Sequence, residues 1–117
     1  MVDDDAAARQ GARALVAAAP GFTSLGEVAS GEEAIEALIE LGPDLVIVDT
    51  EMPGLDGYET SRRLLAARPL TTVILVHADQ EAPNQETVAR SRAAATIARA
   101  ALTPNSLQGL WGDHRVG

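Results

Sequence analysis

The sequence contains no cysteine, which excludes disulfide bonds and metal sites built on thiolates. Aromatic residues make up only 3% of the chain, so we do not expect a surface that stacks nucleic-acid bases. The net charge of −8 argues against DNA or RNA binding, because phosphate contacts need a basic patch. No apolar run approaches the roughly 18 residues of a membrane helix, and no secretory leader is recognisable. We therefore expect a cytoplasmic protein that contacts neither nucleic acid nor membrane.

The remaining composition is that of a soluble globular protein. Hydrophobic residues account for 46% of the 117 residues and charged residues for 22%. A chain of this length forms one domain with a sizeable core. We expect the domain to span residues 1–112 and residues 113–117 to form a C-terminal tail.

Segments typical of helices and strands alternate along the chain. The patterns predict helices over residues 5–19, 31–41, 56–67 and 83–93 and from residue 104 onward, and strands over residues 22–29, 45–49, 71–76 and 95–98. Because the connections between them are short, this alternation predicts a parallel sheet covered by helices and joined by right-handed crossovers.

The second predicted helix carries a clear start signal. Ser30 and Glu33 have the spacing of a capping box, in which a hydroxyl and a carboxylate satisfy free N–H groups of the first turn. The apolar spacing that follows predicts an inward face. Its members are Ala34, Ile35, Leu38 and Ile39.

The most informative segment runs from Leu45 to Gly57. Four consecutive apolar residues, Leu45 to Val48, are typical of a strand buried on both faces of a parallel sheet. The run ends on Asp49, and the carboxyl end of such a strand is where ligands bind. A Pro/Gly loop, Met52-Pro53-Gly54-Leu55-Asp56-Gly57, follows directly.

This segment resembles the phosphoacceptor segment of bacterial response-regulator receiver domains, which are CheY-like, and in particular receivers of LuxR/NarL-type regulators. The resemblance extends from Val2-Asp3-Asp4-Asp5 to Thr103-Pro104, close in the first half and looser in the second. It implies a doubly wound, flavodoxin-like α/β fold with strand order 2-1-3-4-5. It also implies that Asp49 accepts a phosphoryl group from a sensor histidine kinase in two-component signal transduction, which makes the chain a phosphoprotein carrying an aspartyl phosphate.

A cluster of carboxylates is expected beside Asp49. Asp3, Asp4 and Asp49 would repel one another at the strand ends unless a hard divalent cation such as Mg²⁺ lay among them. The resemblance implies that these three residues and the backbone carbonyl of Glu51 bind Mg²⁺, with Asp4 as the acid that touches the metal directly. An alternative is that Asp3 to Asp5 only cap the following helix.

Two positions that carry the family's chemistry are changed. His77 stands where receivers have a Thr or Ser that bonds the phosphoryl group, and Arg99 stands where they have a Lys. The His77 imidazole could donate a hydrogen bond to a phosphoryl oxygen, or could simply lie in solvent or bond to backbone. Arg99 keeps the charge of the lysine with a different geometry. Ile97 occupies the place of an aromatic switch residue, and a buried core position is the favoured interpretation.

The first strand of such a sheet is largely missing, because only Met1 and Val2 precede Asp3. In the order 2-1-3-4-5 that strand is central, so its loss would leave backbone groups unpaired on two neighbours. An upstream start, trimming, or a segment from a swapped partner would each account for the gap.

Two other functions remain open. A degenerate pseudo-receiver would act as a protein-interaction module without phosphate, which the changes at His77, Ile97 and Arg99 favour. A phosphohydrolase of the haloacid dehalogenase type is disfavoured, because its second Asp corresponds to Glu51 here, so we do not expect an enzyme. A homodimer through the last helices is also expected from the resemblance. Leu107, Leu110 and Trp111 are the residues that could contribute to it.

Overall fold

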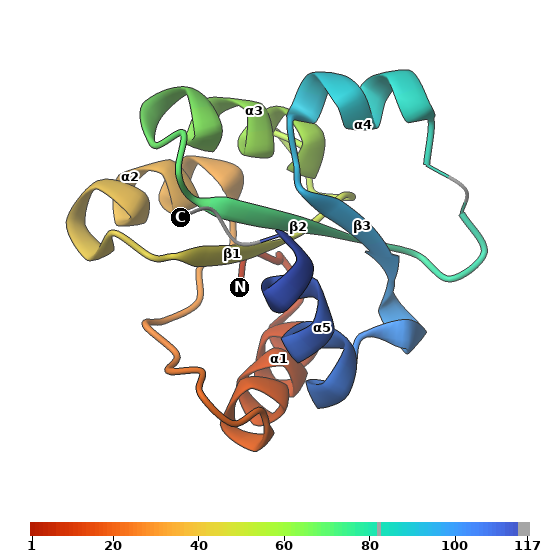
Figure 1. Ribbon diagram of the computed structural model, residues 1–117. Helices are drawn as coiled ribbons and strands as arrows, with labels where there is room; N and C mark the ends of the chain where they lie inside the picture. Colours follow the sequence, from red (N-terminus) through yellow and green to blue (C-terminus); the bar gives the residue numbers. More distant parts are fainter. Residues whose placement is uncertain (82, 115–117) are drawn as a thin grey trace.

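Three parallel strands form the regular part of the sheet in the computed structural model, which describes residues 1–81 and 83–114 (Figure 1). They are β1 (Leu45–Asp49), β2 (Thr72–His77) and β3 (Ala95–Ala98), in the order β1-β2-β3. Val48 lies opposite Leu75 and Val76 lies opposite Ile97, so β2 is central. The parallel sheet predicted from the alternating pattern is confirmed, and so is the doubly wound fold that the resemblance implies.

Helices cover both faces of this sheet. Figure 1 shows α1 and α5 on one face, with α2 and α3 on the other and α4 next to α3. The bounds are α1 Ala6–Ala18, α2 Gly31–Leu41, α3 Gly57–Ala67, α4 Gln85–Ser91 and α5 Pro104–His114, with a short 3₁₀ turn, η1, at Arg99–Ala101. The last helix therefore extends past residue 113, where we expected a tail to begin; residues 115–117 lie outside the described part. No helix within the described ranges is long and apolar enough to span a bilayer.

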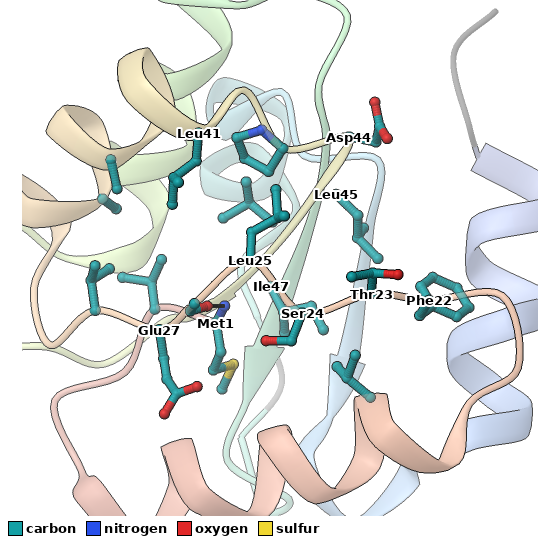
Figure 2. Close-up of a pocket in the computed structure, with 18 of the residues that line it drawn as sticks. Met1, Phe22, Thr23, Ser24, Leu25, Glu27, Leu41, Asp44, Leu45 and Ile47 are labelled. Atoms are coloured by element: carbon teal, nitrogen blue, oxygen red, sulfur yellow. Dashed lines mark hydrogen bonds between the residues drawn. The ribbon is translucent and has the colours of Figure 1, made fainter.

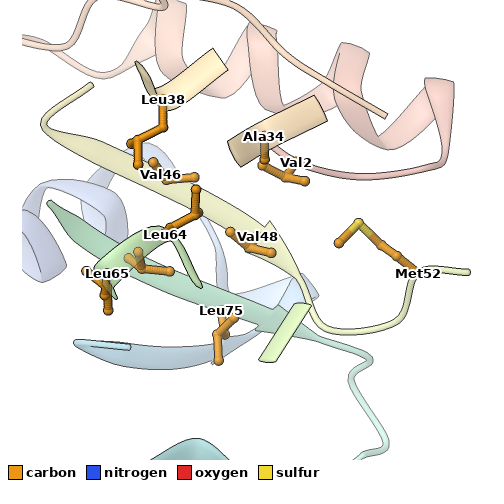
Figure 3. Packing of buried hydrophobic residues seen from close by; sticks show 10 residues of the cluster. Val2, Ala34, Leu38, Val46, Val48, Met52, Leu64, Leu65 and Leu75 are labelled. Carbon is orange, nitrogen blue, oxygen red and sulfur yellow. The ribbon is translucent and has the colours of Figure 1, made fainter. Parts of the chain in front are cut away.

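The core consists of two layers, one on each face of the sheet. Val46 and Val48 of β1 pack with residues of α2 and α3, among them Leu38 and Leu64 (Figure 3). Ile47, between them in sequence, packs on the opposite face with Leu107 of α5. Because successive side chains of a strand point to opposite faces, both of which are covered here, β1 needs a continuous apolar run.

The residues before Asp3 contribute only one bridged position, Val2, to a further strand. Val2 forms isolated parallel bridges to Val48 on one side and to Val28 on the other. This arrangement is a remnant of the expected order, with Val2 between residues 22–28 and β1. The prediction of a strand over residues 22–29 is wrong, because a strand needs a partner along its length and only Met1 to Asp3 are there to pair with it.

The predicted start of the second helix, α2, is confirmed in its local bonding. Ser30 Oγ accepts a hydrogen bond from Glu33 N at 3.1 Å, and the Glu33 carboxylate accepts one from Ala29 N at 3.0 Å. Asp56 likewise caps α3 by accepting from Glu59 N at 2.9 Å. One inward assignment is wrong: Ile39 is 70% exposed, because it lies past the edge of the face that packs on the sheet.

Candidate phosphoacceptor site

Asp49 and Asp3 are neighbours because the backbone of Val2 is bound to β1. Val2 N donates to Ile47 O at 2.7 Å, and Asp49 N donates to Val2 O at 2.9 Å. This pairing fixes the residue after Val2 beside the carboxyl end of β1. The carboxylate oxygens of Asp3, Asp4 and Asp49 consequently lie within 4.8 Å of one another. The predicted clustering of these three residues is present, with Asp3 and Asp49 buried and Asp4 exposed.

The acidic run Asp3 to Asp5 divides between two tasks. Asp5 caps α1, since its carboxylate accepts a hydrogen bond from Ala7 N at 3.0 Å. Asp3 is fully buried and its Oδ1 accepts from Asp5 N at 3.0 Å, while Oδ2 faces Arg99. Helix capping thus accounts for Asp5 alone and leaves Asp3 and Asp4 in the carboxylate cluster.

Arg99 brings a positive charge to this cluster. It lies in η1, directly after β3, and one guanidinium nitrogen is 3.3 Å from both Asp3 Oδ2 and Asp49 Oδ1. Because β3 is two strands away from β1, this contact connects opposite sides of the sheet's carboxyl edge. The expected proximity of Arg99 to the acceptor is present, in the form of an ion pair with both buried acids.

Two residues that the sequence did not single out help to hold this arrangement. Arg9 of α1 donates to the backbone carbonyl of Asp3 at 2.8 Å. Asp79, two residues past β2, accepts a hydrogen bond from Ala100 N at 2.6 Å and so fastens η1, which carries Arg99. The position of Asp79, an Asp just past the end of a predicted strand, is the feature of the sequence that could have pointed to it. A further signal is that the chain has no lysine, so a permanently charged side-chain donor at this site has to be an arginine.

Burial raises the pKa of Asp49 to about 6, and the negative charge of Asp3 adds to this effect. A hydrogen bond from Glu51 N, at 3.4 Å from Asp49 Oδ1, and the charge of Arg99 both act in the opposite direction. Desolvation and the like charge of Asp3 therefore raise the pKa of Asp49 by more than the Arg99 guanidinium lowers it. A net negative cluster of this kind favours a bound cation.

The loop after β1 approaches this site closely at Gly57. A Cβ atom on Gly57 would lie 2.0 Å from the Asp49 carbonyl oxygen and 2.7 Å from Thr50 Cα. Gly57 N also donates to Thr50 O at 3.2 Å. Only glycine allows the start of α3 to pack so tightly against the end of β1. The Pro/Gly loop noticed in the sequence therefore has a steric basis. Glu51, which directly precedes this loop, is exposed.

His77 and Ile97 are placed differently from the carboxylate cluster. His77 ends β2, one position beyond the partner of Asp49, and its Nδ1 lies 2.9 Å from the carbonyl oxygen of Ala78. Within residues 1–81 and 83–114, no ion pair or hydrogen bond joins His77 to Asp49. Ile97 packs against the core layer that contains Ile47 and Leu107, but it is half-buried and not buried as expected.

A family model described as the response regulator receiver domain matches residues 1–107. The chain belongs to the response regulator receiver family. Solved receivers have the same fold: the response regulator domain of Thermotoga maritima CheB aligns over 99% of this chain and 94% of its own, with 28% identity and a TM-score of 0.83. The signal receiver domain of a modulated diguanylate cyclase from Desulfovibrio desulfuricans G20 aligns over 97% of this chain and 88% of its own, with 27% identity and a TM-score of 0.82. The CheY-like fold inferred from the sequence is confirmed.

Curated relatives of this receiver are longer than the chain. Response regulator GacA of Pseudomonas viridiflava is 37% identical over 83 residues, which cover 71% of this chain and 39% of GacA. The nitrate/nitrite response regulator NarL of Escherichia coli K12 is 41% identical over 64 residues, 55% of this chain and 30% of NarL. A protein-glutamate methylesterase/protein-glutamine glutaminase of Geobacter metallireducens is 39% identical over 75 residues, 64% of this chain and 22% of that protein. The chain thus spans well under half of the length of these relatives.

Proposed function

We propose that this receiver accepts a phosphoryl group on Asp49 from a sensor histidine kinase. The observation that carries the proposal is the position of Asp49. Its carboxylate ends the buried strand β1, lies within 4.8 Å of Asp3 and Asp4, and is 3.3 Å from the Arg99 guanidinium. A carboxylate nucleophile beside two further acids and one cation suits phosphoryl transfer, in which positioning and charge neutralisation do most of the work.

The donor set at the site fits Mg²⁺. Asp3, Asp4 and Asp49 offer hard oxygen ligands, and together they carry more negative charge than Arg99 balances. These three residues, with the backbone carbonyl of Glu51, would hold the ion. When bound, Mg²⁺ supplies charge neutralisation for the phosphoryl oxygens.

The Asp49 carboxylate would attack phosphorus in line with the leaving group. An O–P bond to Asp49 forms as the bond from phosphorus to the donor breaks, and the product is an acyl phosphate. Arg99 would pair with the phosphoryl oxygens, for which its planar guanidinium is well suited. His77 would donate a hydrogen bond from the end of β2, in place of the hydroxyl found in other receivers. Burial of Asp49 would limit access of bulk water to the acyl phosphate.

Phosphorylation can be tested by intact mass spectrometry. We would incubate the chain with Mg²⁺ and acetyl phosphate and expect the mass of one phosphoryl group to be added. The variant Asp49→Asn should add none. Asp56→Asn is the matched control, because Asp56 is also an acid of the same loop region but caps α3 and lies outside the carboxylate cluster. It should be modified like the wild type.

The opposite result would overturn the proposal. A chain that shows a folded circular dichroism spectrum and gains no phosphoryl group would instead be the phosphate-independent interaction module. Equal modification of the wild type and Asp49→Asn would place the acceptor elsewhere.

The remaining assignments follow from the proposed role. The chain itself would catalyse no turnover of a metabolite, and its partner would be a kinase in the cytoplasm.

The homodimer through the last helices needs revision in one respect. Leu107 is fully buried in the core and Trp111 packs edge-on against Phe22 with ring centroids 6.4 Å apart. Leu107 is therefore not available to a second copy, and the half-exposed Leu110 and Trp111 would carry such a contact.

A further inference from the structure

The outer side of α2 carries a line of acids. Glu32, Glu36 and Glu40 are exposed and follow one another at four-residue spacing, so they lie on one side of the helix. Like charges at this spacing repel one another. No ion pair among residues 1–81 and 83–114 involves any of the three. This side of α2 therefore presents a negative charge that the described part of the chain leaves unbalanced.

The outer side of α3, the neighbouring helix, is basic. Arg62 and Arg63 both form ion pairs with Glu59, so these three side chains together carry one positive charge. Arg68, the residue at the C-terminal cap of α3, is exposed and belongs to no described ion pair. We call the outer surface of these two helices the α2/α3 face. It is acidic along one helix and basic along the other.

Ile39 interrupts the charged surface of α2 with a large apolar side chain that is 70% exposed. The apolar side of α2 that lines the cavity in Figure 2, where Leu41 is labelled, does not include it. At about 100° per residue, Ile39 lies between Glu36 and Gly31 around the helix. Thr60 of α3 lies against Gly31. Ile39 therefore points to solvent above the seam between α2 and α3.

The helices α2 and α3 lie side by side and run in the same direction (Figure 1). Near their starts, Gly31 lies against Thr60. At their ends, a Cβ atom on Gly42 would lie 2.8 Å from the Arg68 guanidinium. Residues midway along one helix are therefore level with residues midway along the other, and the acidic and basic halves of the α2/α3 face are aligned end to end.

A two-fold rotation brings the acidic half of this face onto the basic half. A rotation axis parallel to the helices and above their seam carries α2 of one copy onto α3 of a second copy at the same level. Glu36, midway along α2, then faces Arg62, midway along α3, in both halves of the interface. Each Ile39 meets its own equivalent at the axis. An axis across the helices would instead place the acids of one α2 against those of the other, so charge selects the first arrangement.

We propose that the α2/α3 face binds a second copy of this chain as an isologous two-fold dimer. Ile39 lies at its apolar centre, and the Glu36 and Arg62 side chains pair across the axis at its rim. A second copy is the occupant that the charges favour. A uniformly basic partner would leave the arginines of α3 against like charges, and a uniformly acidic one would do the same for the acids of α2.

The size of the face indicates a weak dimer. Two helices of 11 residues each cover a surface about 16 Å long and about 20 Å wide, roughly 320 Å² in projection. Stable complexes bury about 800 Å² from each partner. We therefore expect a dissociation constant on the order of 100 µM.

This contact is separate from the others discussed for the chain. A dimer through α5 would use the opposite face of the sheet (Figure 1), so variants distinguish the two contacts. The α2/α3 face contains no residue of the phosphoacceptor site. The proposal therefore holds or fails independently of phosphorylation at Asp49.

Sedimentation equilibrium of the full chain measures the dimer. At about 0.15 M salt the Debye length is about 8 Å, so the net charge of −8 on each copy is largely screened, whereas charges in contact are screened much less. We expect the average mass to rise from that of one chain, 12.2 kDa, toward twice that value as the concentration increases from about 10 µM to about 1 mM.

Charge reversal identifies the face. Glu36→Arg and Arg62→Glu should each weaken dimerisation about tenfold or more, because each places like charges opposite one another. Mixed in equal amounts, the two variants should associate about as tightly as the wild type, because each then supplies the opposite charge that the other needs. Glu86→Arg, which changes the net charge equally on α4 and outside the α2/α3 face, should dimerise like the wild type.

The apolar centre is tested by Ile39→Asn, which should weaken dimerisation about tenfold or more. Leu25→Asn is the matched control at an exposed leucine outside the face and should have no effect. All substituted residues are exposed, and circular dichroism melting checks that each variant folds. A folded wild-type chain that stays monomeric up to about 1 mM would overturn the proposal. So would a mixture of the two charge variants that stays monomeric, or a dimer that Leu110→Asn abolishes and Ile39→Asn preserves.

Discussion

At the scale of single residues, the buried acid Asp49 makes the stability of the domain depend on pH. Its pKa of about 6 lies above the ordinary value of 3.8, so the folded state holds this proton more tightly than the unfolded chain. Between about pH 4 and pH 6 the folded state binds more protons, and stability therefore falls as the pH rises through this window. Above about pH 6 the charged Asp49 lowers the free energy of unfolding by its full amount. This amount is up to about 3 kcal/mol, because the pKa is raised by roughly two units.

Asp49→Asn should remove this dependence in the absence of divalent cations. We expect the variant to match the wild type near pH 4, where Asp49 is protonated, and to be more stable by about 1–3 kcal/mol near pH 8. Urea denaturation in EDTA at the two pH values measures the difference. A stability difference that is the same at both pH values would show that Asp49 is not held in an unfavourable charged state.

Arg99 acts at the same scale as a built-in counter-ion. Arg99→Met should leave Asp3 and Asp49 facing each other without a cation, at a cost of about 1–2 kcal/mol near pH 8, moderated because the Arg99 side chain is 43% exposed. Mg²⁺ should then raise the melting temperature of the variant by more than that of the wild type, because no guanidinium competes for the carboxylates. Arg63→Met, which loses only a surface pair with Glu59, is the control and should show the wild-type response. Equal Mg²⁺ effects in all three proteins would contradict this role for Arg99.

At the scale of elements, the junction between β1 and α3 depends on Gly57. Gly57→Ala would place a methyl group against the Asp49 carbonyl and the Thr50 backbone, neither of which can move without shifting the strand end. We expect a loss of about 3 kcal/mol or more. Gly11→Ala is the matched control in α1, where nothing lies within 4 Å of the added atom. It should stabilise by about 0.5–1 kcal/mol, because alanine favours a helix. Thermal or urea denaturation of both variants distinguishes the two environments, and similar losses at both glycines would contradict the steric argument.

Elements whose partners are local could be predicted from the sequence. The caps of α2 and α3 depend on residues three positions apart, and the run Leu45 to Val48 specifies a strand covered on both faces. The segment 22–29 could not be predicted in this way, because its pattern is typical of a strand but its partner is largely missing. In the candidate site, Asp3, Asp49 and Arg99 were predicted together through the resemblance to receivers. Their direct ion pairing could not be predicted, because the strand order brings these residues to one edge of the sheet but does not fix which oxygens the long Arg99 side chain reaches.

At the scale of the whole molecule, the sheet is complete on one side and interrupted on the other. Val73, Ile74, Leu75 and Val76 of β2 are fully buried between β1 and β3. On the other side of β1, the described backbone hydrogen bonds connect residues 22–28 to the sheet only through Met1 to Asp3. Burial and hydrogen bonding are thus concentrated in β1, β2, α2 and α3, so cooperative stability should be concentrated there as well.

Native-state hydrogen exchange should resolve this division. The amides of β2 should exchange only when the whole domain unfolds, with a free energy equal to that from urea denaturation. Amides of residues 23–26 should exchange far faster, through local opening, because no described backbone hydrogen bond involves their N–H groups. Slow exchange of residues 23–26, at the rate of Leu75, would contradict this division, because it would mean that the segment unfolds only together with the sheet.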